Sequence, residues 1–535
     1  MSLLVVNFIV SFLLIFQKLR LIRVASLITL LANGVQLWLI TELLSVFQWL
    51  TPLSLRLSWL LVILLQLFTL YKIQFSWQSA YWLIQKRWLD LPLLDKGLLS
   101  FLALLLLVLL SLGIAQPPNN WDSMTYHLSR VMHWIQQQSV AHYASHIDRQ
   151  IFMTPFSEYW ILNTVVLTGN DYFANAVQWM ALVGSIIVST LLVQQVGGSF
   201  RSQMLAAYLV LSIPIALYES LSTQTDLLAA FFVLSALFCF LRLYLQWESA
   251  YVWSLGISIG LALFTKATAY FFLLPLVICY AAVWLIRKEK RWFYAGLSIS
   301  VVVILLNVPF YARNFAAFQT PIPTTWALNN EAFGMKPLVS NITKNAVFNL
   351  TTPFPSANQV LLNQLYGIHR LVGVSLNEPK LSLTPFEMPV HNKFFSQDYA
   401  PNPLHAVLFI FIIPFIYLFR ERFNTTFYLL FGIGIAGFLI LLVFMKFQVF
   451  GTRFQIPFWA LLSVWVAVVW DKLAPQSVVW QKLWLLVFTG FLSVMSIYYL
   501  YNCTNLSLAS QKNIFNTPRE ALYFANSRPE LYPSY

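Results

Sequence analysis

The stretch that decides the fold is GLLSFLALLLLVLLSLGIA, residues 97–115, which carries no charge over a length that spans a hydrocarbon core of about 30 Å as a helix. Similar apolar stretches recur along all 535 residues, of which 59% are hydrophobic and only 10% charged. A soluble domain has roughly a quarter charged residues, so a water-soluble fold is excluded. Because lipid offers the backbone no hydrogen-bond partner, the sequence predicts an all-α integral membrane protein.

The apolar pattern predicts a polytopic bundle of about 12–14 transmembrane helices, with interfacial amphipathic helices in the outer loops. The first candidate span, Leu3 to Phe16, is as short as a signal-peptide core. No basic residue precedes it and no small-residue cleavage site follows, so we interpret it as a span. We expect fourteen spans, starting near Leu3, Val24, Leu57, Gly97, Asp171, Ser202, Asp226, Ala250, Thr268, Trp292, Leu404, Thr426, Phe454 and Lys482.

The formal charge of +13 reflects topology rather than nucleic-acid binding, because the basic residues form short clusters between spans and no contiguous basic face. One set of short loops holds seventeen Lys and Arg residues, including the cluster at 287–291. The alternating set holds four, Arg56, Lys266, Lys446 and Arg453. The richer set is predicted to be cytoplasmic, which puts the long polar segments 116–170 and 314–403 outside.

This pattern divides the chain into five parts. We expect extra N-terminal spans at 1–96, a transmembrane module at 97–313 that includes the first outer loop 116–170, an outer loop or lid at 314–403, C-terminal spans at 404–501 and an outer tail at 502–535. Residues 122–138 have apolar positions at helical spacing and predict an amphipathic surface helix. The Pro-rich and Asn-rich stretches between 321 and 403 predict an irregular segment without its own core.

A carboxylate stands at the predicted outer interface, where Asp122 follows the span 97–115 and the sequence QPPNNW. Sugar transfer from a lipid phosphate needs such a group to accept a proton or orient the acceptor, together with cations that hold the phosphate. The alternative interpretation is an N-terminal helix cap, which Asp also favours. Spacing alone does not separate the two.

A family resemblance adds to this interpretation. Residues Asn119 to His127 (NNWDSMTYH) resemble the first outer loop of the GT-C glycosyltransferases, which include protein O-mannosyltransferases, aminoarabinose transferases and a bacterial dolichyl-phosphate-mannose-like family. In that loop an Asp is catalytic, and in the aminoarabinose branch a Tyr follows four residues later. Asp122 and Tyr126 match this spacing, and His127 comes next.

Further stretches are similar to the same superfamily and occur in the same order. TPFSEYW, residues 154–160, matches a Lys-Pro-x-x-x-Tyr-Trp signature at Pro155, Tyr159 and Trp160, with Thr154 in place of the Lys. Residues 221–230 with Asp226, 260–266 and 311–314 are also similar, and the resemblance covers roughly 97–323 with a weaker echo at 446–457. It implies a GT-C fold and a glycosyltransferase that uses a polyprenyl-phosphate sugar.

Three cations end predicted spans at the outer interface, namely Lys266, Arg313 and Arg453. Charges in such places tend to mark function, although long basic side chains also reach from the membrane toward water. Arg313 is the favoured phosphate ligand, because a guanidinium binds phosphate bidentately and the resemblance points there too. We expect it to hold the carrier while 314–403 closes over the lipid. Glu219 and Asp226 flank a short outer turn as candidate supports, and Asp226 could equally cap its helix.

A metal site has weaker support. His127, His133, His142 and His146 crowd one loop, but only His142 and His146 have the i, i+4 spacing of a helical pair. A divalent cation that bridges Asp122 and the lipid phosphate is chemically reasonable and stays open. The three cysteines, Cys239, Cys279 and Cys503, are too few and too dispersed for a disulfide framework or metal cluster.

The sequence therefore predicts a glycosyltransferase in a bacterial inner membrane, with its active site on the outer face. The expected partners are a polyprenyl-phosphate sugar, a glycan, lipid or protein acceptor, and membrane lipid, with no nucleic acid. The runner-up is a transporter or flippase, which would place ionisable residues near the bilayer midplane on broken helices rather than at one interface. A non-catalytic scaffold is the third hypothesis.

Overall fold

The computed structural model describes residues 1–323, 328–389, 391–473, 478–525 and 528–534, and within them it contains helices and no strand longer than an isolated bridge. Eleven of the described helices are long and apolar enough to cross a membrane, which confirms the all-α polytopic fold. They are α1 (Ser2–Leu19), α2 (Ile22–Val46), α3 (Pro52–Lys72), α5 (Leu93–Ala115), α9 (Ala176–Gln195), α12 (Asp226–Leu245), α14 (Ala269–Arg287), α15 (Lys290–Phe318), α20 (Thr425–Phe444), α21 (Ile456–Leu473) and α22 (Val478–Asn502).

Three expected spans are shorter helices. Two of them, α13 (Ser249–Thr265) and α19 (Pro403–Leu418), are apolar throughout. The third, α10 (Phe200–Leu211), stops before Pro214, which begins the short helix α11 (Pro214–Glu219). Proline lacks a backbone donor and favours the first helical position, so the chain restarts there as a second helix.

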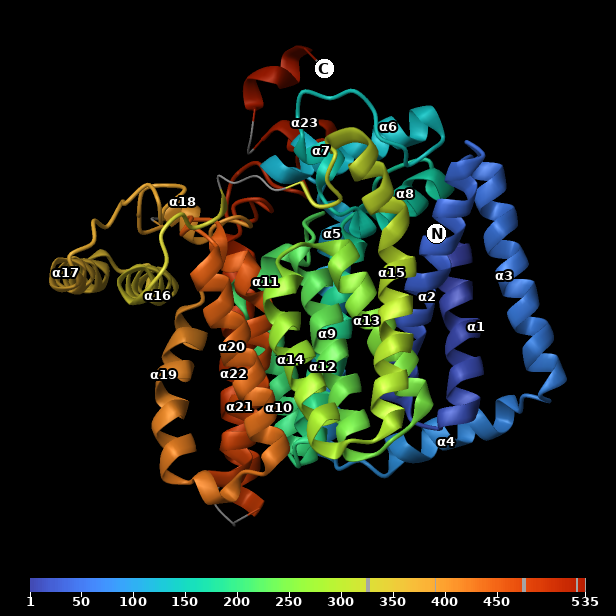
Figure 1. Cartoon of the computed structure of the whole chain (residues 1–535), viewed down its shortest axis with the longest axis horizontal. Helices are drawn as coiled ribbons and strands as arrows, with labels where there is room; N and C mark the ends of the chain where they lie inside the picture. Colours follow the sequence, from blue (N-terminus) through green and yellow to red (C-terminus); the bar gives the residue numbers. More distant parts are fainter. Residues whose placement is uncertain (324–327, 390, 474–477, 526–527, 535) are drawn as a thin grey trace.

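The helices outside the bundle gather at its two ends (Figure 1). The basic helix α4 (Trp77–Leu89) crosses the lower end, whereas α6 (Leu128–Gln137), α7 (Arg149–Phe152) and α8 (Phe156–Thr168) lie at the upper end with α23 (Arg519–Phe524). The helices α16 (Met335–Leu350) and α17 (Pro355–Val372) lie beside the bundle at its upper part. The two long polar segments thus lie toward the same end of the molecule.

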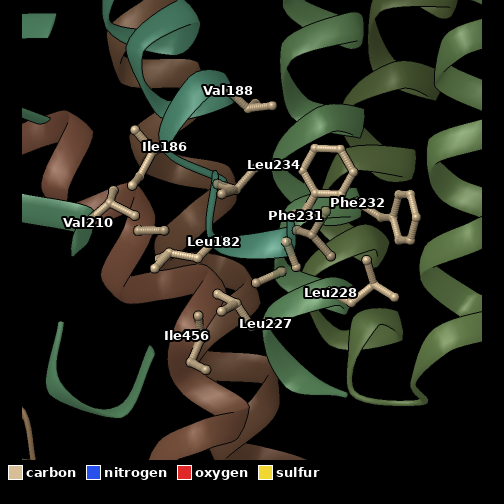
Figure 2. Packing of buried hydrophobic residues seen from close by; sticks show 14 of the residues in the cluster. Leu182, Ile186, Val188, Val210, Leu227, Leu228, Phe231, Phe232, Leu234 and Ile456 are labelled. Atoms are coloured by element: carbon tan, nitrogen blue, oxygen red, sulfur yellow. The ribbon is translucent and has the colours of Figure 1, made fainter. Parts of the chain in front are cut away.

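The core of the bundle is formed by α9, α12 and α21, whose apolar windows are mostly buried, while α5 and α15 present most of theirs to the outside. Leu182 and Ile186 of α9 meet Leu227 and Phe231 of α12 in this core (Figure 2). The two helices approach closely at Gly184, where an added Cβ would lie 2.7 Å from the ring of Phe231. A side chain there would force α9 and α12 apart.

The surface helix expected at 122–138 is confirmed, with one deviation. Residues Ser123–His127 form a π-helical turn, and α6 continues from Leu128 to Gln137. Gln138 then adopts a left-handed conformation with φ of 54°, which ends the helix. A π turn is wider than an α-helical turn, and such turns are frequent at functional sites.

The expectation that the 321–403 segment is irregular is wrong for the described residues. This part contains α16 (Met335–Leu350), α17 (Pro355–Val372) and the short α18 (His391–Phe394), and α15 runs past Arg313 to Phe318. A small apolar cluster holds α16 and α17 together and is completed by Phe447 from beyond α20; it comprises Val347, Phe348, Leu365, Leu376, Phe386 and Phe447. Asparagines interrupt the apolar pattern of α16, so its hydropathy does not predict a buried helix.

Candidate active site

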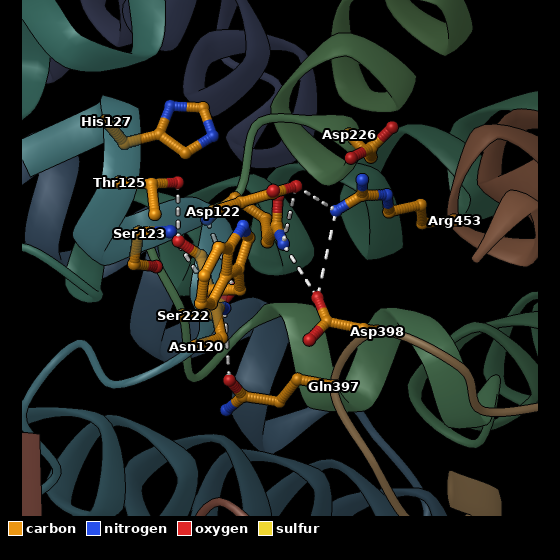
Figure 3. Close-up of polar contacts among 12 residues, drawn as sticks. Asn120, Asp122, Ser123, Thr125, His127, Ser222, Asp226, Gln397, Asp398 and Arg453 are labelled. Atoms are coloured by element: carbon orange, nitrogen blue, oxygen red, sulfur yellow. Dashed lines mark hydrogen bonds and ion pairs between the residues drawn. The ribbon is translucent and has the colours of Figure 1, made fainter. Parts of the chain in front are cut away.

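Asp122 is buried near the start of the polar segment 116–170, and its carboxylate is paired with a cation. The Nη1 of Arg453 donates to its Oδ2 at 2.6 Å (Figure 3). Arg149 approaches its Oδ1 at 3.7 Å. Asp122 stands at the N-cap position of the π turn but makes no side-chain capping hydrogen bond. The capping alternative is therefore wrong, and the carboxylate is directed into a polar cluster.

The electrostatic surroundings keep Asp122 ionised. Burial alone would raise the pKa of this carboxyl, but the Arg453 guanidinium and His127 outweigh burial and hold the pKa well below its usual range. The hydroxyl of Tyr126, one helical turn on, also hydrogen-bonds to the charged carboxylate. The guanidinium of Arg149 lies 4.9 Å from the centre of the Tyr126 ring. The predicted pair Asp122 and Tyr126 thus forms one contact unit.

His127 hydrogen-bonds to a second buried carboxylate rather than to Asp122. Its Nδ1 lies 2.8 Å from Oε1 of Glu158, and Arg130 donates to the same oxygen at 3.1 Å. Arg130 is fully buried and also donates to the backbone carbonyl of Gln150 at 2.6 Å. These contacts fasten α6 to α8, so His127 acts as part of the support beneath Asp122.

Two further predicted residues form an ion pair beside Arg453. The Nζ of Lys266 donates to Oδ2 of Asp226 at 2.5 Å, and Asp226 is buried at the start of α12. Thr225 rather than Asp226 occupies the N-cap position. Glu219 is fully buried close by, and the charges of Asp226, Lys266 and Arg453 all act on its carboxyl. The cluster therefore combines four predicted residues with Asp122.

Arg313 belongs to a separate network. Both of its Nη atoms donate to Glu42 of α2, at 2.7 and 2.8 Å, and Nη2 also donates to the hydroxyl of Tyr159 at 2.9 Å. Tyr159 in turn donates to Glu42 at 2.6 Å. The structure thus brings Arg313 and Tyr159 together, but their hydrogen bonds do not reach the partners of Asp122. None of the three interfacial cations merely extends toward water, because each one pairs with a buried carboxylate.

Sequence reasoning missed Asp398, which comes from the second long polar segment, 314–403, just before α19. Its Oδ1 lies 3.8 Å from Nη1 of Arg453 and accepts a hydrogen bond from Nε2 of Gln224 at 3.1 Å (Figure 3). Glu42 and Arg149 were missed as well. No periodic signal marks these residues, because their contacts join parts of the chain far apart in sequence.

The histidines do not assemble into a metal site within the described parts of the chain, where no group of three or more His, Cys, Asp or Glu residues could hold an ion. His142 lies 2.8 Å from Oδ1 of Asn314 and packs against Phe310. Burial lowers the pKa of His142 to about 4, which keeps its ring neutral.

Comparison with known proteins shows what the chain is similar to. Residues 100–320 match the model of the dolichyl-phosphate-mannose-protein mannosyltransferase family. No curated protein matches the chain. Among solved structures, it is similar to ArnT from Cupriavidus metallidurans bound to undecaprenyl phosphate, with 13% identity, a TM-score of 0.50, and coverage of 77% of this chain and 71% of that one. For ArnT from the same organism in the apo state, the identity is 14% and the TM-score 0.48, with coverage of 80% of this chain and 67% of that one.

The family match includes Asp122, Asp226 and Lys266, and the ArnT likeness shows a shared fold. Together, the family match and the shared fold support a membrane glycosyltransferase. The predicted resemblance and the enzyme class are thereby confirmed, and the transporter alternative is set aside.

Proposed function

We propose that this glycosyltransferase takes its sugar from a polyprenyl-phosphate carrier on the non-cytoplasmic face of a bacterial inner membrane, with Asp122 as the base or acceptor-orienting carboxylate. The observation that carries the proposal is the contact between the buried Asp122 carboxylate and the Arg453 guanidinium. Sugar transfer needs an anion at the acceptor oxygen and a cation at the departing phosphate. The 2.6 Å pair places both kinds of group in one site.

Arg453 is suited to meet the phosphate. Its Nη1 is taken by Asp122, but its buried Nε has no hydrogen-bond partner among the described residues. A buried donor without a partner is costly, and a phosphate oxygen would satisfy it with a charge-assisted hydrogen bond. Lys266 stands nearby with its side chain partly exposed and adds a second cation. ArnT bound to undecaprenyl phosphate, which has the same fold, supports a carrier of this kind.

The role of Arg313 as a phosphate ligand stays a proposal. Glu42 occupies both Nη atoms of the guanidinium, whereas the buried Nε has no hydrogen-bond partner among the described residues. A phosphate would therefore have to displace that carboxylate, share its donors or bind at Nε. A glycan, a lipid or a protein remains the proposed acceptor, and its hydroxyl would meet Asp122 from the outer side.

The test is sugar transfer by purified protein in lipid vesicles, with a panel of polyprenyl-phosphate hexoses and pentoses as donors. We expect Asp122→Asn to lower kcat by about 100- to 10,000-fold, the usual range for a lost acid–base group. Asp148→Asn is the matched control, because Asp148 is an exposed carboxylate in the same polar segment, 116–170, as Asp122. Wild-type turnover in a correctly folded Asp122→Asn protein would refute the mechanism.

A further inference from the structure

Asp398 follows a stretch of the chain that is fixed by buried contacts. The preceding Gln397 is fully buried, accepts a hydrogen bond from the Asn120 side chain at 3.2 Å and donates from its backbone to Asn505. Phe395 is also buried and packs edge-on against Tyr499. The carboxylate of Asp398 is therefore placed by the fold, while about a fifth of its side chain stays exposed and can reach a substrate.

Asp398 and Asp122 share the same two donors. Arg453 Nη1 lies 2.6 Å from Asp122 and 3.8 Å from Asp398, and Gln224 Nε2 lies 3.5 Å from Asp122 and 3.1 Å from Asp398. Arg453 thus sits much closer to one carboxylate than to the other. This asymmetry gives the two neighbouring carboxylates different proton affinities, as in other enzymes that use one carboxylate as a base and another as a stabilising charge.

The proton affinities differ accordingly. Burial raises the pKa of Asp398 to about 6; Arg453 opposes this rise, and the negative charges of Asp122 and Asp226 add to it. The charged or titratable neighbours that act on this group are Arg453, Asp122, Asp226 and the adjacent Tyr399. At neutral pH Asp398 is mostly ionised and is the stronger base of the two acids, because the pKa of Asp122 is held far lower.

We propose that Asp398 is the general base of the transfer, while Asp122 stays ionised and orients the acceptor. This inference rests on the proposed function. The acceptor oxygen bonds to the anomeric carbon as the bond from that carbon to the phosphate oxygen breaks. The acceptor proton passes to the Asp398 carboxylate, and the carrier leaves as polyprenyl phosphate with the electron pair of the broken bond. Release of the proton to water then restores Asp398.

The experiment compares wild type, Asp398→Asn, Asp398→Glu and Asp122→Asn in vesicles with the donor that wild type consumes from the panel. For Asp398→Asn we expect a loss of about 100-fold or more in kcat with little change in donor KM. The wild-type kcat/KM should fall as the pH drops through about 6, and Asp398→Asn should lose this acid limb. Asp398→Glu should recover part of the rate. Glu387→Gln, an exposed carboxylate of the same segment, is the control.

The outcomes separate the two proposals. If wild type transfers sugar and Asp122→Asn does not, but Asp398→Asn keeps the wild-type rate and acid limb, Asp398 is not the base and the proposed function stands. A rise in donor KM without a fall in kcat would also overturn the assignment, because it would indicate donor binding. If wild type itself transfers no sugar from any polyprenyl-phosphate donor, the proposed function fails instead.

Discussion

The pairing of each buried charge decides what the residues of this site can do. Asp122, Asp226, Lys266 and Arg453 could be selected from sequence because each one directly follows, begins or precedes an apolar stretch. Asp398 could not, since it reaches the cluster from a polar segment without periodicity. Sequence reasoning therefore finds charges at the ends of spans but not their partners, which depend on how distant segments pack.

The Glu42–Arg313 pair gives a prediction at this scale. Glu42→Gln leaves the Arg313 guanidinium with a neutral partner in a mostly buried position, and we expect the free energy of unfolding to fall by about 2–3 kcal/mol. Arg313→Gln in the Glu42→Gln background removes the unpaired charge and should recover part of that loss. Denaturant unfolding in detergent micelles measures both variants. A double variant that is less stable than Glu42→Gln alone would contradict this account.

Helix α16 shows how an element outside the spans can position the site. One face carries asparagines at every fourth position, and two of these, Asn345 and Asn349, hold Gln455 from both sides at 2.7 and 2.9 Å. Asn402 donates to Asn349 at 2.9 Å. Gln455 ends the 3-10 turn η4 (Gly451–Gln455) that also carries Arg453. The buried amides thus tie α16 to the turn that presents the guanidinium.

Substitution of Asn349 tests this link. Asn349→Leu keeps the branched shape of the side chain but leaves the Gln455 Oε1 and the Asn402 Nδ2 without their buried partner, while Gln455 keeps its bond to Asn345. We expect this to cost about 1–3 kcal/mol of stability. If the amides position Arg453, donor KM should rise about tenfold as well, because the guanidinium loses its fixed direction toward the phosphate. Thr343→Ala is the control, because the Thr343 hydroxyl hydrogen-bonds to backbone carbonyls of the same helix, those of Val339 and Ser340. An unchanged donor KM in a folded Asn349→Leu protein would limit the amides to a structural role.

Apolar elements were predictable where polar ones were not. All fourteen expected spans have a helix at their position, because length and apolarity are local properties. The helix α8 was missed although nearly all of its residues are buried, since the polar loop around it masks a stretch of 13 residues. In α16 the asparagines form hydrogen bonds inside the protein, so a polar sequence becomes a buried helix. A hydropathy scale counts each asparagine as polar and does not include the hydrogen bonds that allow it to be buried.

At the scale of the whole molecule, the polar clusters share one end and the basic connections favour the other. The helix α6, which follows Asp122 and its π turn, lies at the upper end, and the basic helix α4 lies at the lower end (Figure 1). Arg453 and Asp398 belong to the same cluster as Asp122. The count of seventeen basic residues against four predicts that the lower end is cytoplasmic. The proposed site would then face the side on which a lipid-linked sugar meets an envelope acceptor.

Single-cysteine labelling tests this orientation in intact cells with a membrane-impermeant maleimide. Cys239 and Cys503 are buried and Cys279 is half-buried, so a background with all three changed to Ser removes unwanted signal. We expect Asp148→Cys, in the outer segment, to react before the cells are opened, and Lys288→Cys, in the basic connection after α14, to react only afterwards. Both positions are exposed, so access to the side of the membrane decides the result. Labelling of Lys288→Cys alone in intact cells would reverse the orientation and move the proposed transfer to the cytoplasmic face.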